Sequence, residues 1–275
     1  MKTDFLVLWV DDNKLVIDSL ASNLGEWLDE KGFELKVIPH KDATNVLADI
    51  KNNDVELIVI DYKLPKKNGN EIIQDIRKNG CYQDIVFYSE GVPPKEPYDG
   101  VFFVSKEDAK TRIKELVDLK LLRSSDPIGI RGWIVADAIE LEGMVNELLI
   151  HCYTTKEGFT FTERLFFNDN NPLEFGTKAD MLNGIIKDYI AHLRTKGVKD
   201  GQIEKLEVLK KVHDEFKKEV VEIRNIVAHQ RIEVTENGKV IKKKSMNVLD
   251  QATIVRIRKN LRKHRDNLLR LQRII

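Results

Sequence analysis

Cysteine is scarce in this sequence, since the 275 residues include only Cys81 and Cys152. The two cysteines fall in different predicted domains, so they do not form a disulfide framework and we expect a reducing compartment. Long apolar runs are lacking as well. The run Phe5–Val10 is far too short for a signal peptide or a membrane span, and it ends in two acids. We therefore expect a cytoplasmic protein that has no membrane partner.

Net charge is absent, because Lys+Arg and Asp+Glu both number 45. Such a balance predicts no overall attraction to nucleic acid or to a membrane surface. The charges are divided unevenly, however: residues 1–125 hold 18 basic and 23 acidic side chains, a net −5, which leaves +5 for the remainder. A hydrophobic fraction of 42% and a charged fraction of 33% are typical of an ordinary globular protein. The length predicts about two domains.

Several motifs that mark enzyme classes are missing from the sequence. There is no glycine-rich phosphate loop and no nucleophile elbow, which argues against the two classes of enzyme that use them. His151 and Cys152 are adjacent but have no second ligand pair at zinc spacing, so a zinc site is not expected there.

The first half alternates short apolar runs with amphipathic stretches, which is typical of an α/β doubly wound fold with a five-stranded parallel sheet. The predicted strands are Phe5–Val10, Glu34–His40, Val55–Asp61, Asp84–Ser89 and Val101–Val104. Helices are expected after Asn13, which can cap the first of them, and at about 42–52, 69–79 and 106–123. Glu90–Gly100 carries three prolines, Pro93, Pro94 and Pro97, so a loop is expected where a fourth helix would lie.

The second half changes to long helical periods, which predicts an all-α helical bundle. Asp126-Pro127 marks the junction, because proline suits the first turn of a new helix, and the predicted domains are 1–123 and 124–275. Helices are expected at about 128–154, 177–195, 202–230 and 249–275, with a loop at Glu157–Asn171. Arg231–Ser245 is predicted to be a small β-hairpin whose tight turn uses Asn237-Gly238.

Polar residues gather at the predicted carboxyl ends of the strands in the first half. Asp11 and Asp12 follow the first strand, and Asp61 ends the third, its spatial neighbour in a doubly wound sheet. Three nearby carboxylates repel one another unless a cation lies among them, and hard oxygen ligands with open positions suit Mg²⁺. Ser89 ends the fourth strand and offers a hydroxyl to a phosphoryl oxygen. Lys106 follows the fifth strand and offers a compact positive charge.

This order of residues resembles the receiver domain of bacterial response regulators, over about residues 1–123. The pattern is an acid pair, then I-D-Y-K-L-P-K-K-N-G, then a strand that ends in Ser and a strand that ends in S-K. The resemblance implies that Asp11, Asp12 and Asp61 bind Mg²⁺ and that Asp61 accepts a phosphoryl group from a histidine kinase. It also implies that Ser89 and Lys106 sense that group.

Three further positions bear on the resemblance. Phe103, three residues before Lys106, takes the place of the aromatic switch residue of the family. The residue after the sensing hydroxyl is usually small, whereas here Glu90 adds negative charge and bulk beside the site. Lys63, two residues after Asp61, is expected to pair with that carboxylate. These departures leave open whether Asp61 is phosphorylated, and the alternative is a docking module that has the shape of a receiver.

The helix predicted at 202–230 ends in R-N-I-V-A-H, residues 224–229. At about 100° per residue, Asn225 and His229 project together on the side opposite the apolar stripe, and Arg224 lies roughly 140° from His229. The hexapeptide resembles the R-N-x-x-x-H signature of HEPN domains, all-helical modules that include many metal-independent ribonucleases. The resemblance implies a homodimer through the helical domain, in which two motifs form one composite cleft.

The HEPN resemblance implies that the helical domain is a metal-independent endoribonuclease and that this domain needs no cofactor. Cleavage of RNA by its own 2′-hydroxyl needs a base that titrates near neutral pH, as histidine does, and a fork of donors for the phosphorane, as in arginine. His229 would be that base, Arg224 that donor, and Asn225 would orient the histidine or a phosphate. Residues 231–275 hold 13 basic and 4 acidic side chains, which suits an RNA partner.

Two functions from different classes are compatible with this sequence. One is a signalling protein in which a phosphorylatable receiver-like domain controls a dimeric ribonuclease. The other is a non-catalytic interaction protein whose helical domain dimerises or binds nucleic acid. A conventional transcription regulator is less favoured, because no helix-turn-helix spacing with a short glycine turn occurs in the second half.

Overall fold

The computed structural model describes residues 3–65, 67–90, 98–123, 126–153, 173–198, 200–235, 238–243, 246–247 and 250–274. The chain divides into two compact units, Lys2–Ser125 and Asp126–Ile275, with Met1 assigned to the second. Each unit has hydrophobic clusters of its own. Among the described segments, no helix combines the length and apolar character that crossing a membrane requires.

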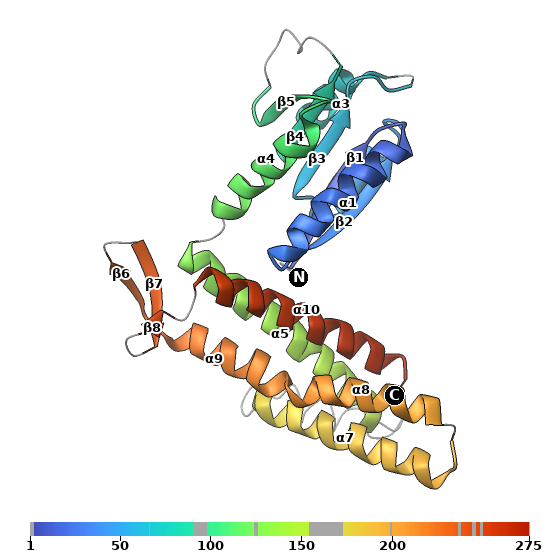
Figure 1. Ribbon diagram of the computed structural model, residues 1–275, viewed down its shortest axis with the longest axis vertical. Coiled ribbons are helices and arrows are strands. Elements are labelled where there is room, and N and C mark those ends of the chain that lie inside the picture. The colour runs from blue at the N-terminus through green and yellow to red at the C-terminus, as the bar shows by residue number, and fades with distance from the viewer. Residues whose placement is uncertain are drawn as a thin grey trace. The chain divides into compact units, whose positions relative to one another are not determined.

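The first unit is a five-stranded parallel sheet of order β2-β1-β3-β4-β5 with helices on both faces (Figure 1). Its strands are β1 (Asp4–Val10), β2 (Glu34–His40), β3 (Leu57–Asp61), β4 (Asp84–Ser89) and β5 (Val101–Ser105). Its helices are α1 (Lys14–Glu30), α2 (Val46–Asn52), α3 (Gly69–Lys78) and α4 (Ala109–Arg123). The doubly wound α/β fold that the alternating pattern predicts is confirmed.

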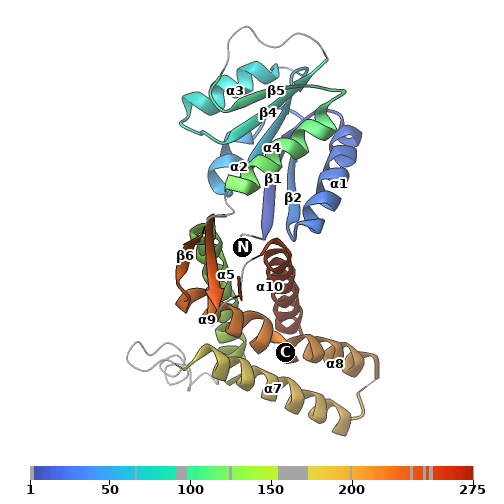
Figure 2. The same cartoon turned by 60° about the vertical axis from the view of Figure 1, so that its left-hand side comes forward.

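The middle strands of this sheet are buried on both faces, as parallel strands usually are. Helices α1 and α4 cover one face of the sheet, and α2 and α3 cover the other (Figure 2). Alternate side chains of the middle strands pack toward these two layers of helices. Trp9, for example, packs on the side of α1 and α4, whereas its neighbour Val10 packs on the side of α2 and α3. Two apolar layers therefore hold the strand ends, and the polar residues on them, in fixed positions.

The starts of the helices follow from their capping residues. Asn13 caps α1 as expected, since its side-chain oxygen accepts a hydrogen bond from the Leu15 N–H at 3.1 Å. The helix α2 begins later than predicted, at Val46, because the preceding Asn45 has a left-handed backbone with φ of 63°. In the predicted loop before β5, the described Glu90 and residues 98–100 are not helical, while Pro93, Pro94 and Pro97 lie outside the described residues.

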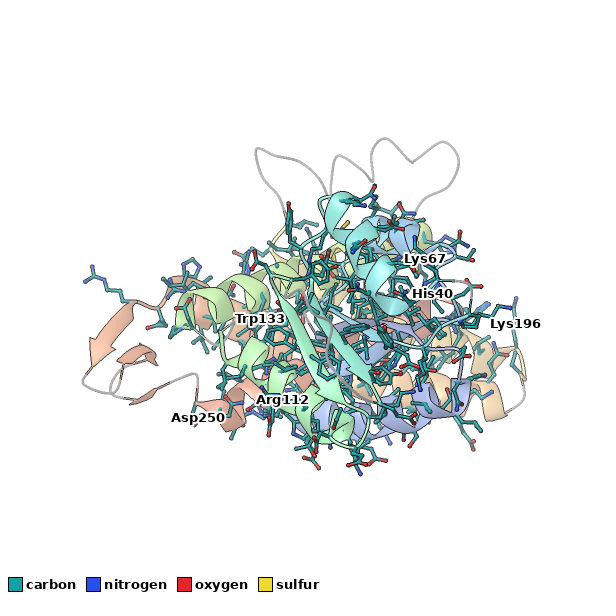
Figure 3. The ribbon with its side chains drawn as sticks, turned by 90° about the horizontal axis from the view of Figure 1, so that it is seen from above. His40, Lys67, Arg112, Trp133, Lys196 and Asp250 are labelled. Carbon is teal, nitrogen blue, oxygen red and sulfur yellow. The ribbon has the colours of Figure 1, made fainter. Side chains whose placement is uncertain are left out.

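The second unit is a helical bundle with a small antiparallel sheet. Its helices are α5 (Pro127–Tyr153), α7 (Phe175–Thr195), α8 (Asp200–Asp214), α9 (Glu222–His229) and α10 (Gln251–Gln272), with a π-helical turn at Lys217–Val221. Its strands are β6 (Ile232–Thr235), β7 (Gly238–Lys243) and β8 (Met246–Asn247). Asp250, labelled in Figure 3, caps α10 by accepting a hydrogen bond from the Thr253 N–H at 2.7 Å. The predicted bundle with a hairpin is confirmed.

The π-helical turn corrects the prediction of one regular helix over 202–230. The Glu222 N–H donates to the carbonyl of Lys217, five residues earlier, so the backbone makes a wide turn between α8 and α9. The apolar residues on either side of that turn still face one core, with Leu209, Phe216 and Val227 buried. Spacing alone did not reveal the turn, because steps of three and four residues continue across it.

Two details of the predicted loops and hairpin also change. Gly238 opens β7 opposite Thr235, so the turn does not lie at Asn237-Gly238 as predicted, and residues 236–237 lie outside the described residues. The short strand β8 makes a third strand that the hairpin prediction did not include. The predicted loop Glu157–Asn171 lies outside the described part of the chain.

Candidate functional site

Three carboxylates meet at the carboxyl edge of the first unit's sheet. Asp11 follows β1 and Asp61 ends β3, and each side chain is 2% exposed, whereas Asp12 is exposed. One ligand oxygen from each of the three lies within 4.8 Å of the others. The adjacency of β1 and β3 causes this meeting, because parallel neighbours end at the same edge.

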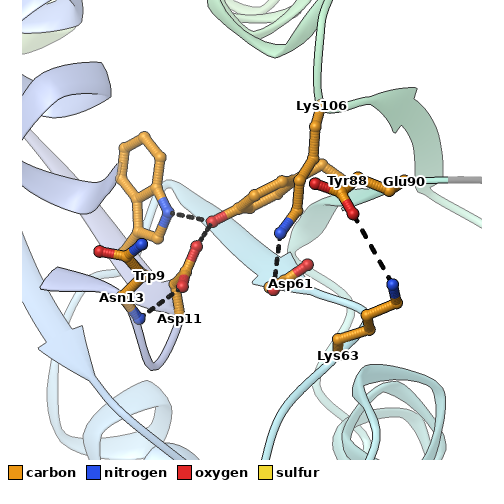
Figure 4. A network of polar contacts seen from close by, with 8 residues as sticks. All are labelled: Trp9, Asp11, Asn13, Asp61, Lys63, Tyr88, Glu90 and Lys106. Carbon is orange, nitrogen blue, oxygen red and sulfur yellow. Dashed lines mark hydrogen bonds and ion pairs between the residues drawn. The ribbon is translucent and has the colours of Figure 1, made fainter. Parts of the chain in front are cut away.

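Asp61 is held from one side by a lysine. The Nζ of Lys106 donates to Oδ2 of Asp61 at 3.1 Å (Figure 4), while Oδ1 is buried without a hydrogen-bond partner in the described part of the chain. Burial raises the pKa of Asp61 and the charge of Asp11 adds to that effect, whereas Lys106 opposes it. A hard cation beside Oδ1 would satisfy the orphaned oxygen and offset the repulsion, so these residues fit Mg²⁺.

Asp11 is held through both of its oxygens. Its Oδ1 accepts a hydrogen bond from the Asn13 N–H at 2.7 Å, and its Oδ2 accepts one from the hydroxyl of Tyr88. The same hydroxyl accepts a hydrogen bond from Nε1 of Trp9 at 3.3 Å (Figure 4). Tyr88 is not among the site residues that the sequence predicted. The available signal was a phenol in an otherwise apolar strand, next to Ser89.

The side chain of Lys63 pairs with Glu90 and not with Asp61, which corrects the prediction. Its Nζ lies 3.7 Å from Oε2 of Glu90, and both side chains are exposed (Figure 4). Lys106 lies beside Asp61 instead: it follows the end of β5, and its Nζ is 3.1 Å from Oδ2 of Asp61. The Lys63–Glu90 pair therefore offsets part of the negative charge that Glu90 adds beside the site.

The remaining predicted residues lie on β4 and β5. Ser89 is 3% exposed at the end of β4, and its carbonyl accepts a hydrogen bond from the Lys106 N–H at 3.1 Å. Phe103 is half-buried on β5, and its ring meets the ring of Phe87 edge to face with centroids 6.2 Å apart. The structure thus places Phe103 two strands from Asp61, and the strand order keeps Ser89 between them.

A second candidate site lies in the helical unit. Arg224, Asn225 and His229 all line one cavity of about 560 Å³ beside α5 and α7. Nη1 of Arg224 donates to Oδ1 of Asn225 at 2.9 Å, which shows that the long arginine side chain turns toward its neighbours. The structure therefore brings the three predicted residues to one cavity, although Arg224 starts from another side of α9.

The wall of that cavity carries charges of both signs. Glu142, Glu174, Glu222 and Lys217 line it together with the three predicted residues. Glu142 is held by Lys178, whose side chain is 5% exposed and whose Nζ donates to Oε1 at 2.8 Å. These residues could not be identified from the sequence, because they come from α5, α7 and its cap, the π-helical turn and α9, which only the folded bundle brings together.

Comparison with known proteins identifies the first unit. The family model for the response regulator receiver domain matches residues 7–95. A Haloferax volcanii relative whose name describes a candidate transcriptional regulator is 24% identical over 140 residues, which are 49% of this chain and 22% of that protein. The regulatory protein VanRc of Enterococcus gallinarum is 28% identical over 85 residues, 31% of this chain and 34% of that protein. The chain thus spans about a fifth to a third of the length of these curated relatives.

Solved receiver structures are similar to the same part of the chain. A CheY-like receiver domain protein of Methanospirillum hungatei JF-1 is 21% identical with a TM-score of 0.35, and the match covers 43% of this chain and 94% of that one. A receiver protein of Sinorhizobium medicae WSM419 is 14% identical with a TM-score of 0.38, and the match covers 46% and 100%. The family model assigns residues 7–95, which contain Asp11, Asp12, Asp61 and Ser89, to the response regulator receiver domain.

Proposed function

We propose that the receiver domain accepts a phosphoryl group on Asp61 from a histidine kinase and passes this signal to the helical unit. The observation that carries the proposal is the setting of Asp61, whose Oδ2 is paired with Lys106 and whose buried Oδ1 has no partner in the described chain. Asp11 and Asp12 complete the carboxylate cluster. A magnesium ion held by these three residues would neutralise negative charge on the transferred group.

The residues of the chain divide the work of such a transfer. An oxygen of the Asp61 carboxylate attacks phosphorus and forms an acyl phosphate, while the bond from phosphorus to the kinase imidazole breaks. The departing imidazole nitrogen takes a proton from solvent water and so leaves as neutral histidine. Lys106 can bind the negatively charged phosphoryl oxygens, because its Nζ already lies 3.1 Å from Oδ2 of Asp61. The Ser89 hydroxyl is positioned by the neighbouring strand end, where it can donate to a phosphoryl oxygen.

A small phosphodonor tests this proposal without the kinase. The full chain is incubated with acetyl phosphate and Mg²⁺, and incorporated phosphate is followed by intact-protein mass spectrometry before and after acid treatment. We expect acid-labile phosphate on the wild type and on Asp99→Asn, an exposed aspartate outside the cluster, and none on Asp61→Asn. Equal labelling of Asp61→Asn would contradict the proposal.

A second candidate function concerns RNA. Because Arg224, Asn225 and His229 line one cavity, we infer that a pair of these chains could cleave RNA without a metal ion. His229 would take the proton of a 2′-hydroxyl, whose oxygen attacks the adjacent phosphorus while the bond to the 5′-oxygen breaks. The imidazole of a second chain would return a proton to the leaving oxygen, and Arg224 would stabilise the phosphorane.

Purified protein and total RNA in EDTA test the second candidate. The wild type and His192→Ala, which removes an exposed histidine of α7, are expected to degrade RNA, and His229→Ala is not. Equal activity in all three proteins would indicate a contaminant. Binding without cleavage, with an affinity that falls steeply as salt is added, would favour the non-catalytic interaction protein instead. Sedimentation of the same samples tests the homodimer.

A further inference from the structure

A phenol lies buried against the proposed cation site. Tyr88 is in β4, flanked by β3 and β5, and its side chain is fully buried. Its ring packs in the apolar layer on the side of α1 and α4, where phenylalanine would fill the same volume. The hydroxyl is therefore not needed for packing, and burying it costs free energy unless it is hydrogen-bonded.

The Tyr88 hydroxyl is the middle member of a chain of hydrogen bonds that run, donor to acceptor, from Trp9 to Asp11. The indole N–H of Trp9 donates to the oxygen of Tyr88 at 3.3 Å, and the Tyr88 O–H donates to Oδ2 of Asp11 (Figure 4). A tyrosine phenol is neutral at physiological pH and carries one O–H, so it serves Asp11 as a donor while its oxygen accepts from Trp9. Hydrogen bonds arranged in one direction polarise and strengthen one another.

Both oxygens of Asp11 are thereby fixed before any ion arrives. The Asn13 N–H donates to Oδ1 at 2.7 Å from the loop before α1, and Tyr88 donates to Oδ2 from β4. The carboxylate cannot rotate without losing one of these bonds inside a region that is 2% exposed. Its remaining lone pairs are left for the cluster with Asp12 and Asp61.

We propose that Tyr88 is a positioning residue of the divalent-cation site, which it orients by holding Asp11 while Trp9 holds its hydroxyl. This role rests on the proposed function, because it requires that the three carboxylates bind Mg²⁺. Partners that orient a metal ligand commonly change metal affinity by about 10–100-fold when they are removed. Tyr88 acts through Asp11 and does not touch the reacting atoms itself.

Removal of the single hydroxyl oxygen of Tyr88 tests its proposed role as a positioning residue. Tyr88→Phe removes the hydroxyl and keeps the ring, and Tyr82→Phe makes the same change at a tyrosine that is 78% exposed. Magnesium affinity of the full chain is measured by calorimetry together with the midpoint of urea unfolding. We expect about 10-fold weaker binding or more for Tyr88→Phe, and wild-type binding for Tyr82→Phe. Equal affinity of Tyr88→Phe and the wild type would overturn the positioning role alone, whereas no binding by the wild type would overturn the proposed function as well.

Fluorescence gives a readout that altered packing would not produce. In a background of Trp27→Phe and Trp133→Phe, Trp9 is the remaining tryptophan. In this background, saturating Mg²⁺ is expected to change the emission of Trp9 when Tyr88 is present, because Tyr88 links the indole to Asp11. In Tyr88→Phe, saturating Mg²⁺ is expected to leave the emission of Trp9 unchanged. An emission change of the same size in both proteins would overturn the link. Should Tyr88→Phe not fold, Trp9→Phe is expected to weaken magnesium binding in the same direction but less, and unchanged affinity would overturn the role.

Discussion

At the scale of the residue, the acidic cluster depends on a glycine beside it. Gly69 opens α3, and its N–H donates to the Tyr62 carbonyl at 3.0 Å. A Cβ at this position would lie 2.4 Å from the Asp61 carbonyl oxygen and 2.6 Å from Cε2 of Phe87. Neither the strand backbone nor the buried ring can yield cheaply, so the helix can approach Asp61 this closely only with glycine.

Gly69→Ala is therefore expected to lower the free energy of unfolding by about 1–3 kcal/mol, because added atoms in a packed site force the backbone apart. The control is Gly25→Ala in the interior of α1, where the new Cβ would lie 3.6 Å from the nearest atom of Leu35. The control is expected to gain about 0.5–1 kcal/mol from the helix propensity of alanine. Urea unfolding of both variants checks these signs, and a stabilised Gly69→Ala would contradict the close approach.

Sequence reasoning located the acids of the site but not the residues that hold them. Asp11, Asp12 and Asp61 could be placed together because strand ends in a parallel sheet share an edge. The partner of Lys63 could not be predicted, since two long side chains can each reach several carboxylates. Tyr88 escaped notice because a buried aromatic residue in a strand fits the core equally well with or without a polar contact.

At the scale of the element, the π-helical turn is joined to α10 by a buried histidine. Glu219 of that turn accepts from Nε2 of His264 at 2.7 Å and also pairs with Lys263. His264 is fully buried and its ring lies edge to face with the ring of Phe216, on which His213 also stacks.

Burial lowers the pKa of His264 to about 4, against which the hydrogen bond to Glu219 acts only in part. In the unfolded chain histidine titrates near 6.5, so between about pH 6.5 and 4 the unfolded state binds the extra proton. As the pH is lowered through this window, the free energy of unfolding of the helical unit is thus expected to decrease by up to about 3 kcal/mol. Urea unfolding at pH 7 and 5 measures the slope. His264→Gln should make the slope shallower, and the buried His213, whose pKa is also lowered by burial, supplies the remainder. His192→Gln should leave the slope unchanged, and an unchanged slope in His264→Gln would contradict this assignment.

At the scale of the whole molecule, the two units have separate cores and opposite sequence charge. Magnesium binds, in our proposal, to the unit Lys2–Ser125 alone. A ligand that binds only the folded state stabilises it by about 2.7 kcal/mol at 100 times its Kd. We therefore expect Mg²⁺ to slow amide hydrogen exchange throughout the receiver core and to leave α7 and α8 unchanged, as measured by mass spectrometry. Equal protection of both units would contradict separate folding.

The division of the chain and the class of each half followed from periodicity, because steps of two and of three to four residues differ over long windows. The π-helical turn and the start of α2 did not follow from it. The left-handed backbone of Asn45 and the wide hydrogen bond from Glu222 to Lys217 leave the spacing of the apolar residues unchanged, so periodicity does not reveal them.

The π-helical turn at Lys217–Val221 accommodates one residue more than a regular α-helical turn would. The wide turn changes the direction in which side chains project around the helix axis on its two sides. Leu209 is buried in the bundle before the turn, while Arg224 and His229 line their cavity after it. A related sequence that is one residue shorter between Lys217 and Val221 would restore the regular helix and swing the hexapeptide by about 100°. The length of this turn is thus a marker for sorting homologues into those that can form the cavity and those that cannot.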